Sequence, residues 1–70
     1  MSVYPLMEKS IEIAWDYLER SGQIADPEFT SNFLLTSVEH AVRMGERRQL
    51  ILVNRAISEF ERSKGPPRSM

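Results

Sequence analysis

The stretch RMGERRQLILVNRAI, residues 43–57, decides how this chain of 70 residues folds. Three arginines and Gly45 precede an apolar run from Leu50 to Val53, so the stretch either continues one long helix or breaks it. In a continuous helix, the later apolar stripe would be rotated by more than about 100° from the earlier apolar face, and the two halves would need different cores. We therefore predict a tight turn at Gly45 and Glu46. The stripe consists of Leu50, Val53, Ile57 and Phe60.

A strong helix start lies upstream of this turn, in the sequence ADPEF at residues 25–29. Asp26 can accept hydrogen bonds from the free N–H groups of a first helical turn, and Pro27 suits the first helical position. The helix that follows, over about residues 27–44, is apolar around most of its circumference. Such a helix is normally surrounded, so we predict that it is central, with both neighbours packed on it and surface left for a second subunit. Its apolar residues are Phe29, Phe33, Leu34, Leu35, Val38, Ala41, Val42 and Met44.

The flanking helices are expected over about residues 5–21 and 47–63. The first has one clean apolar face at helical spacing, and Gly22 supplies the left-handed residue that ends it. Residues 65–70 carry a glycine and two prolines in no apolar pattern, so we expect a disordered tail. The predicted fold class is all-α: one small three-helix domain over residues 1–64, built as a helical hairpin plus a packing helix. The apolar face of the first helix comprises Met7, Ile11, Ala14, Trp15 and Leu18.

The small size of the chain favours self-association. A domain of this length buries barely enough apolar surface to offset its conformational entropy, and without cysteine it has no disulfide or thiolate zinc site. We therefore expect a homodimer that forms a helical bundle. Ile51 and Leu52 fall outside the main stripe of the third helix, so they either contact the second chain or pack under the turn or against Trp15. The predicted dimer contacts are Phe29, Phe33, Leu34, Ile51 and Leu52.

Charge is divided unevenly along the chain. Residues 1–42 hold two basic and seven acidic residues, a net charge of −5, and residues 43–70 hold seven basic and three acidic residues, a net charge of +4. Such a division indicates either a basic arm for an acidic partner or attraction between the halves of one molecule or of two copies. The arginines of the third helix are expected to face solvent or to pair with Glu8, Glu12 and Glu19.

Nucleic-acid binding is the alternative function. Ala41 and Gly45 have the spacing of a helix-turn-helix unit, and Arg47, Arg48, Arg55 and Arg62 would then contact phosphates. Glu46 and Asn54, however, stand where that motif needs apolar residues, and the overall net charge of −1 is far from the basic footprint of most DNA-binding domains. We therefore expect no nucleic-acid partner.

The sequence contains no recognisable catalytic or cofactor motif. His40 is the only histidine, and the carboxylates of the first helix lack the loop and second ligand class of a cation site. We expect no enzyme activity, no bound metal and no cofactor. The chain shows no signal-peptide pattern and no apolar run near the roughly 20 residues of a membrane span, so we expect a cytoplasmic protein. The predicted function is a non-catalytic, self-associating protein-interaction or regulatory module.

Overall fold

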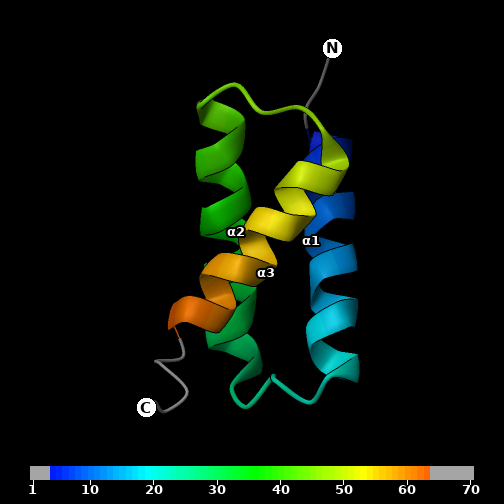
Figure 1. Ribbon diagram of the computed structural model, residues 1–70, viewed down its shortest axis with the longest axis vertical. Coiled ribbons are helices and arrows are strands. Elements are labelled where there is room, and N and C mark those ends of the chain that lie inside the picture. The colour runs from blue at the N-terminus through cyan, green and yellow to red at the C-terminus, as the bar shows by residue number, and fades with distance from the viewer. Residues whose placement is uncertain (1–3, 64–70) are drawn as a thin grey trace.

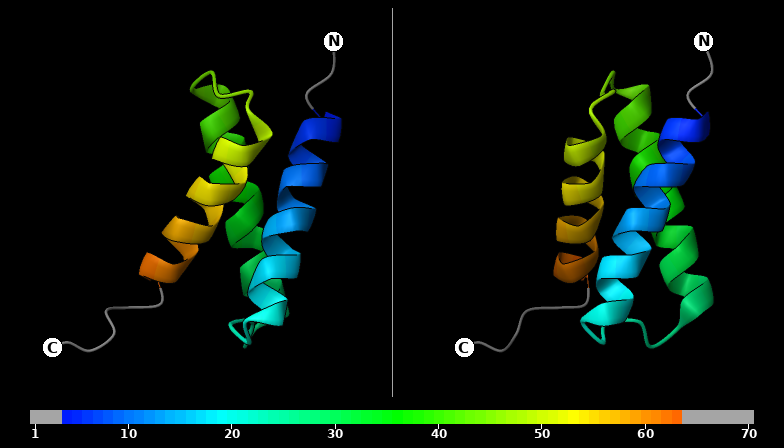
Figure 2. Two further views of the ribbon diagram at one scale, coloured as in Figure 1. Left: turned by 45° about the vertical axis from the view of Figure 1, so that its right-hand side comes forward. Right: turned by 90° about the vertical axis from the view of Figure 1, so that its right-hand side faces the viewer.

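The computed structural model describes residues 4–63, which contain three helices: α1 (Tyr4–Arg20), α2 (Pro27–Arg43) and α3 (Gln49–Ser63). α1 and α2 form an antiparallel hairpin, and α3 crosses one face of it, in front of both helices in Figure 1. Each helix packs against the other two, and the turned views of Figure 2 show the same arrangement. The expected compact, all-helical domain of three helices is confirmed. The tail predicted for residues 65–70 lies outside the described residues.

The first turn follows from Gly22. This residue has a φ of +71°, a conformation that is cheap only for glycine. Its N–H donates to the Glu19 carbonyl at 3.1 Å, and the N–H of Gln23 donates to the Leu18 carbonyl at 2.9 Å. These two hydrogen bonds satisfy the last carbonyls of α1, so the predicted end of the helix is confirmed.

The start of α2 is also the one predicted. The Asp26 carboxylate accepts hydrogen bonds from the N–H groups of Glu28 and Phe29, at 3.1 and 3.2 Å. Pro27 occupies the first helical position, where a missing N–H costs nothing. The cap satisfies two of the donors that the first turn leaves free.

The predicted break at Gly45 is confirmed as well. Gly45 has a φ of +103°, and its N–H donates to the Val42 carbonyl while the N–H of Glu46 donates to the Ala41 carbonyl, each at 3.0 Å. α3 begins at Gln49, two residues later than predicted. The connection is longer because the Glu46 carboxylate holds the backbone that follows it, as described below.

The core draws on one face of each helix. On α1 the prediction is confirmed for Met7, Ala14 and Leu18, while Ile11 and Trp15 are half-buried at the edge of the core. The buried apolar residues are Met7, Ala14, Leu18, Leu34, Val38, Ala41, Val42, Leu52, Val53, Ala56 and Phe60.

The prediction that α2 packs on both neighbours is confirmed, but α2 is no more central than the other two helices. α1 and α3 pack against each other as well as against α2, so the three helices share one core. α2 buries a single face, and its apolar residues Phe29 and Leu35 are 51% and 46% exposed. The apolar residues of α2 cover a wider arc than its buried face, and two positions of that face, Thr30 and Ser37, are polar. The apolar arc therefore did not indicate which side of α2 would be buried. The buried residues of α2 are Thr30, Leu34, Ser37, Val38, Ala41 and Val42.

The predicted stripe of α3 is wrong at its first position. Leu50 is 70% exposed, whereas Leu52 is fully buried. Val53 and Phe60 are buried and Ile57 is half-buried, as expected. The buried face is therefore centred on Ala56, and helical spacing places Leu52 and Phe60 one turn on either side of it. Leu50 lies roughly 120° from Ala56 around the helix and points outward.

Among residues 4–63, the buried residues with hydroxyl groups are Ser10, Thr30 and Ser37. Those of Ser10 and Thr30 donate to the carbonyls of Leu6 and Asp26, four residues earlier, at 2.8 and 2.9 Å. These two groups are therefore satisfied within their own helices. Ser37 differs because its hydroxyl donates across the helix interface to a carboxylate of α3.

Candidate interaction surfaces

Three phenylalanines connect the core to the surface between α2 and α3. The ring centroids of Phe33 and Phe60 are 5.6 Å apart in an edge-to-face arrangement, and Phe29 lies 5.9 Å from Phe33 and 6.3 Å from Phe60. Such distances are favourable for aromatic pairs. Phe60 is 2% exposed and Phe29 is 51% exposed. This phenylalanine cluster therefore reaches from the core, at Phe60, to the solvent, at Phe29.

The cluster contains two of the five predicted dimer contacts, Phe29 and Phe33. Leu34 and Leu52 are fully buried within the single chain, so they offer no surface to a second chain, and their assignment as dimer contacts is corrected. Leu52 follows instead the alternative of packing inside the chain. Ile51 is half-buried and belongs to the first turn of α3. It lies at the opposite end of the α2–α3 pair from Phe29, so the remaining three residues do not form one patch.

Sequence reasoning missed the role of Phe60 in this cluster. The spacing of Phe29 and Phe33, four residues apart, was a sufficient signal that their rings share one face of α2. Phe60 is far away in sequence, and it joins them only because α3 runs back along α2.

The four arginines of the nucleic-acid alternative do not lie on one helix. Arg47 and Arg48 are in the connection before α3. The Arg47 guanidinium donates to the carbonyls of Val42 and Glu46 at 2.7 and 3.0 Å, and Arg48 Nε lies 3.0 Å from Glu46 Oε2. Both side chains are thus engaged in holding the turn.

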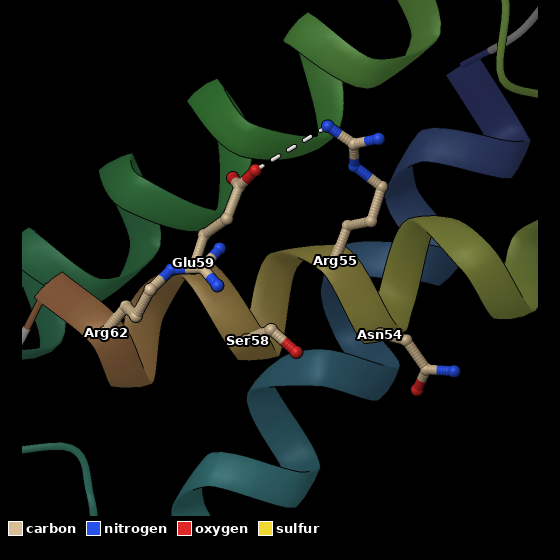
Figure 3. A pocket seen from close by; sticks show the side chains of 5 residues that line it. All are labelled: Asn54, Arg55, Ser58, Glu59 and Arg62. Atoms are coloured by element: carbon tan, nitrogen blue, oxygen red, sulfur yellow. Dashed lines mark ion pairs between the residues drawn. The ribbon is translucent and has the colours of Figure 1, made fainter.

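Arg55 and Arg62 do lie on α3, beside a shallow hollow of about 230 Å³. Figure 3 shows Arg55 and Glu59 extending towards α2, and Asn54 and Ser58 on the other side of α3. Arg55 Nη2 is 3.8 Å from Glu59 Oε2, and Glu59 also accepts the hydroxyl hydrogen of Ser37. A carboxylate therefore interrupts the positive charge along this side of α3. The hollow is lined by Asn54, Arg55, Ser58, Glu59 and Arg62.

The ion pairs across helices that the sequence suggested are not formed. Among residues 4–63, every ion pair joins residues no more than four positions apart, as in Lys9–Glu12 and Arg55–Glu59. The arginines of α3 and the carboxylates of α1 do not face each other. Arg55 extends towards α2, whereas Glu8 and Glu12 line a groove between α1 and α2.

Glu46 has the most strongly perturbed acidity of the described residues. Its carboxylate accepts hydrogen bonds from the guanidinium of Arg48 and from the backbone N–H groups of Arg48 and Arg47, at 2.9 to 3.2 Å. The Arg48 side chain, followed by its backbone N–H, lowers the pKa of Glu46 to about 2, although partial desolvation acts in the opposite direction. The hydrogen bond from its side chain to Glu46 in turn raises the pKa of Arg48. Glu46 therefore acts as a clamp on the turn that precedes α3.

A second surface lies between α1 and α2. A groove of about 400 Å³ is lined by Glu8, Ile11, Glu12 and Trp15 of α1 and by Ser31 of α2. The sequence placed Ile11 and Trp15 on the core face of α1, and both do pack against the core. It gave no sign that each would keep an exposed edge, because that edge depends on how far α2 lies from α1.

His40 is exposed on the surface of α2. The described residues contain no group of three or more side chains suited to hold a metal ion. None of the three helices combines the length and the apolar character needed to cross a membrane.

Comparison of the chain with protein-family models, with curated proteins and with solved structures found no match.

Proposed function

We propose that this protein is a non-catalytic interaction module that associates with a second copy of itself through the phenylalanine cluster. The observation that supports the proposal is the exposure of Phe29. Phe29 is 51% exposed although its ring packs on Phe33 and on the buried ring of Phe60. Aromatic side chains, phenylalanine among them, are enriched in protein interfaces relative to the rest of the surface.

The size of the domain supports the same proposal. A single core in a domain of this length rarely contributes more than about 3–5 kcal/mol of stability. Association that buries Phe29 adds apolar burial at a position where the ring is already ordered, so little further entropy is lost. The interface would have an apolar centre surrounded by a polar rim, as small protein interfaces do.

Sedimentation velocity at micromolar concentration tests the proposal. The 8.1-kDa chain is expected to sediment as a dimer. Phe29→Gln should shift it towards the monomer, while Tyr17→Gln serves as a matched control, because Tyr17 is 49% exposed against 51% for Phe29 and belongs to α1. Circular dichroism checks that both variants remain helical. A wild-type protein that stays monomeric at every concentration would overturn the proposal, and equal dissociation of both variants would overturn the role of the phenylalanine cluster.

A further inference from the structure

The groove between α1 and α2 lies on the face of the hairpin that α3 does not cover. On α2, Phe33 contacts Phe60 of α3, which shows where that helix packs. Ser31, which lines the groove, is two residues before Phe33 and so lies roughly 160° from it around α2. The groove is therefore separate from the phenylalanine cluster and remains open when α3 is in place.

The floor of the groove is apolar. Ile11 and Trp15 are one helical turn apart on α1, and both are half-buried against the core. On the other side, Leu35 follows Ser31 by one turn and is 46% exposed, so it extends the apolar surface along α2. The partly exposed Ile11 and Trp15 on α1 and Leu35 on α2 fit the apolar side chains of a helix laid between the two helices.

Carboxylates line the groove on α1 and flank it on both helices. Glu8 and Glu12 line it on α1, and Glu19 follows Trp15 by one turn on the same side. On α2, Glu28 and Glu39 flank Ser31 and Leu35 at helical spacing.

Local pairs neutralise part of this charge, because Glu12 pairs with Lys9 and Glu39 with Arg43. Within residues 4–63, Glu8, Glu19 and Glu28 form no ion pair. An apolar floor flanked by carboxylates attracts a cationic partner and repels nucleic acid and anionic surfaces.

We propose that this groove binds a basic amphipathic helix of a partner protein. Apolar side chains of the partner pack on Ile11, Trp15 and Leu35, and its lysines or arginines face Glu8, Glu19 and Glu28. A second copy of this chain is a poorer occupant, since α3, the helix that carries Arg55 and Arg62, already buries Leu52, Val53, Ala56 and Phe60 in its own core. This binding does not depend on self-association through the phenylalanine cluster.

Trp15 provides a direct readout, because it is the only tryptophan in the chain. The ligand is a Leu/Lys peptide of about 18 residues, patterned as an amphipathic helix of roughly the length of α1 and free of tryptophan and tyrosine. A Leu/Glu peptide of the same pattern and a scrambled Leu/Lys peptide are the controls. Titration of the full-length protein with the Leu/Lys peptide should shift Trp15 emission to the blue and saturate at one peptide per chain. Neither control peptide should do so.

Variants locate the site. Glu8→Gln/Glu28→Gln should weaken binding of the Leu/Lys peptide about tenfold, from roughly threefold per rim charge. Asp16→Asn/Glu61→Gln makes the same change in net charge outside the groove and should leave affinity within about twofold. Leu35→Lys should weaken binding more than about tenfold, because it places a charge on the apolar floor. Anisotropy of a labelled peptide provides a readout that is independent of Trp15.

Several results would overturn the proposal. They are the absence of saturable binding, equal binding of the Leu/Glu or scrambled peptide, and equal effects of the two double variants. A blue shift of Trp15 emission on adding anionic vesicles would show that a membrane surface occupies the groove. If the wild type is a dimer and Leu35→Lys is a monomer, a second copy of the chain occupies it. Repeating the titration with Phe29→Gln separates this proposal from the proposed function, since that variant should bind the peptide normally whether or not the wild-type protein dimerises.

Discussion

At the scale of single residues, two glycines carry the turns of this fold. Gly22 and Gly45 have φ values of +71° and +103°, and a Cβ added at either would meet no heavy atom within 4 Å. Any loss of stability on substitution therefore comes from the backbone conformation and not from a steric clash. The left-handed helical region accessible to other residues lies near a φ of about +50 to +70°, so Gly22 is close to it and Gly45 is well outside.

We expect Gly22→Ala to destabilise the fold by about 1 kcal/mol and Gly45→Ala by about 2 kcal/mol or more. Urea denaturation followed by circular dichroism measures both. Gly22→Asn is the control, because asparagine adopts the left-handed conformation more readily than alanine and should restore part of the loss. A smaller effect at Gly45 than at Gly22 would contradict this account of the second turn.

Glu46 makes the stability of the fold depend on pH. Because its pKa in the folded state, about 2, lies below its ordinary value of 4.5, ionised Glu46 stabilises the folded state. This contribution is complete above pH 4.5 and is lost as the pH falls from 4.5 towards 2.

We expect Glu46→Gln to be less stable than the wild type at neutral pH. The gap between their urea midpoints should narrow as the pH falls from about 4.5 to about 2. Comparing the two proteins at each pH removes the effect of the other carboxylates, which both contain. A gap that stays constant over this range would show that Glu46 does not clamp the turn.

At the scale of the helices, the Ser37–Glu59 hydrogen bond joins α2 to α3. Ser10, also buried, bonds only to the Leu6 carbonyl of its own helix. The two serines therefore provide a matched pair, because replacing each with alanine brings the same gain in helix propensity, about 0.5 kcal/mol.

We expect Ser10→Ala to be neutral or slightly stabilising and Ser37→Ala to destabilise by about 1 kcal/mol, because Glu59 loses a donor in a half-buried position. The free energy of unfolding in urea gives both values. Equal effects of the two substitutions would mean that the contact between α2 and α3 does not depend on this hydrogen bond.

The orientation of α3 distinguishes the observed core from the one predicted by the sequence. Leu50 and Leu52 belong to the same helix and are 70% and 0% exposed. Leu52→Ala should cost about 2–5 kcal/mol, whereas Leu50→Ala should change stability by no more than about 0.5 kcal/mol. Urea denaturation of the two variants compares them directly. The opposite ranking would mean that α3 is rotated from the position described.

At the scale of the whole molecule, three helices share one core and leave two distinct surfaces. The phenylalanine cluster lies between α2 and α3, and the acidic groove lies between α1 and α2 on the face that α3 leaves uncovered. The surfaces differ in chemistry, since one presents the exposed aromatic side chain of Phe29 and the other has Trp15 beside the carboxylates of Glu8 and Glu12. The two proposed partners, a second copy and a basic helix, would therefore use different surfaces.

Leu52→Ala also has a consequence at this scale. A loss of about 2–5 kcal/mol is comparable to the whole stability of a domain of this size, about 3–5 kcal/mol. We expect this variant to be largely unfolded at low concentration in circular dichroism and to gain helicity as its concentration rises, since association stabilises the folded form. Helicity that does not change with concentration would count against self-association.

The sequence by itself determined the number of helices and where they end. Gly22, Gly45 and the Asp26–Pro27 cap act through hydrogen bonds that reach only a few residues along the chain, so their effect can be read locally. Only the tertiary structure decided that Leu52 is buried in place of Leu50, that α2 is not central, and that Phe60 completes an aromatic cluster with Phe29. These features depend on how each helix is rotated about its own axis, and that rotation is fixed when three apolar faces pack together. An apolar arc wider than the buried face does not reveal in advance which part of it will face the core.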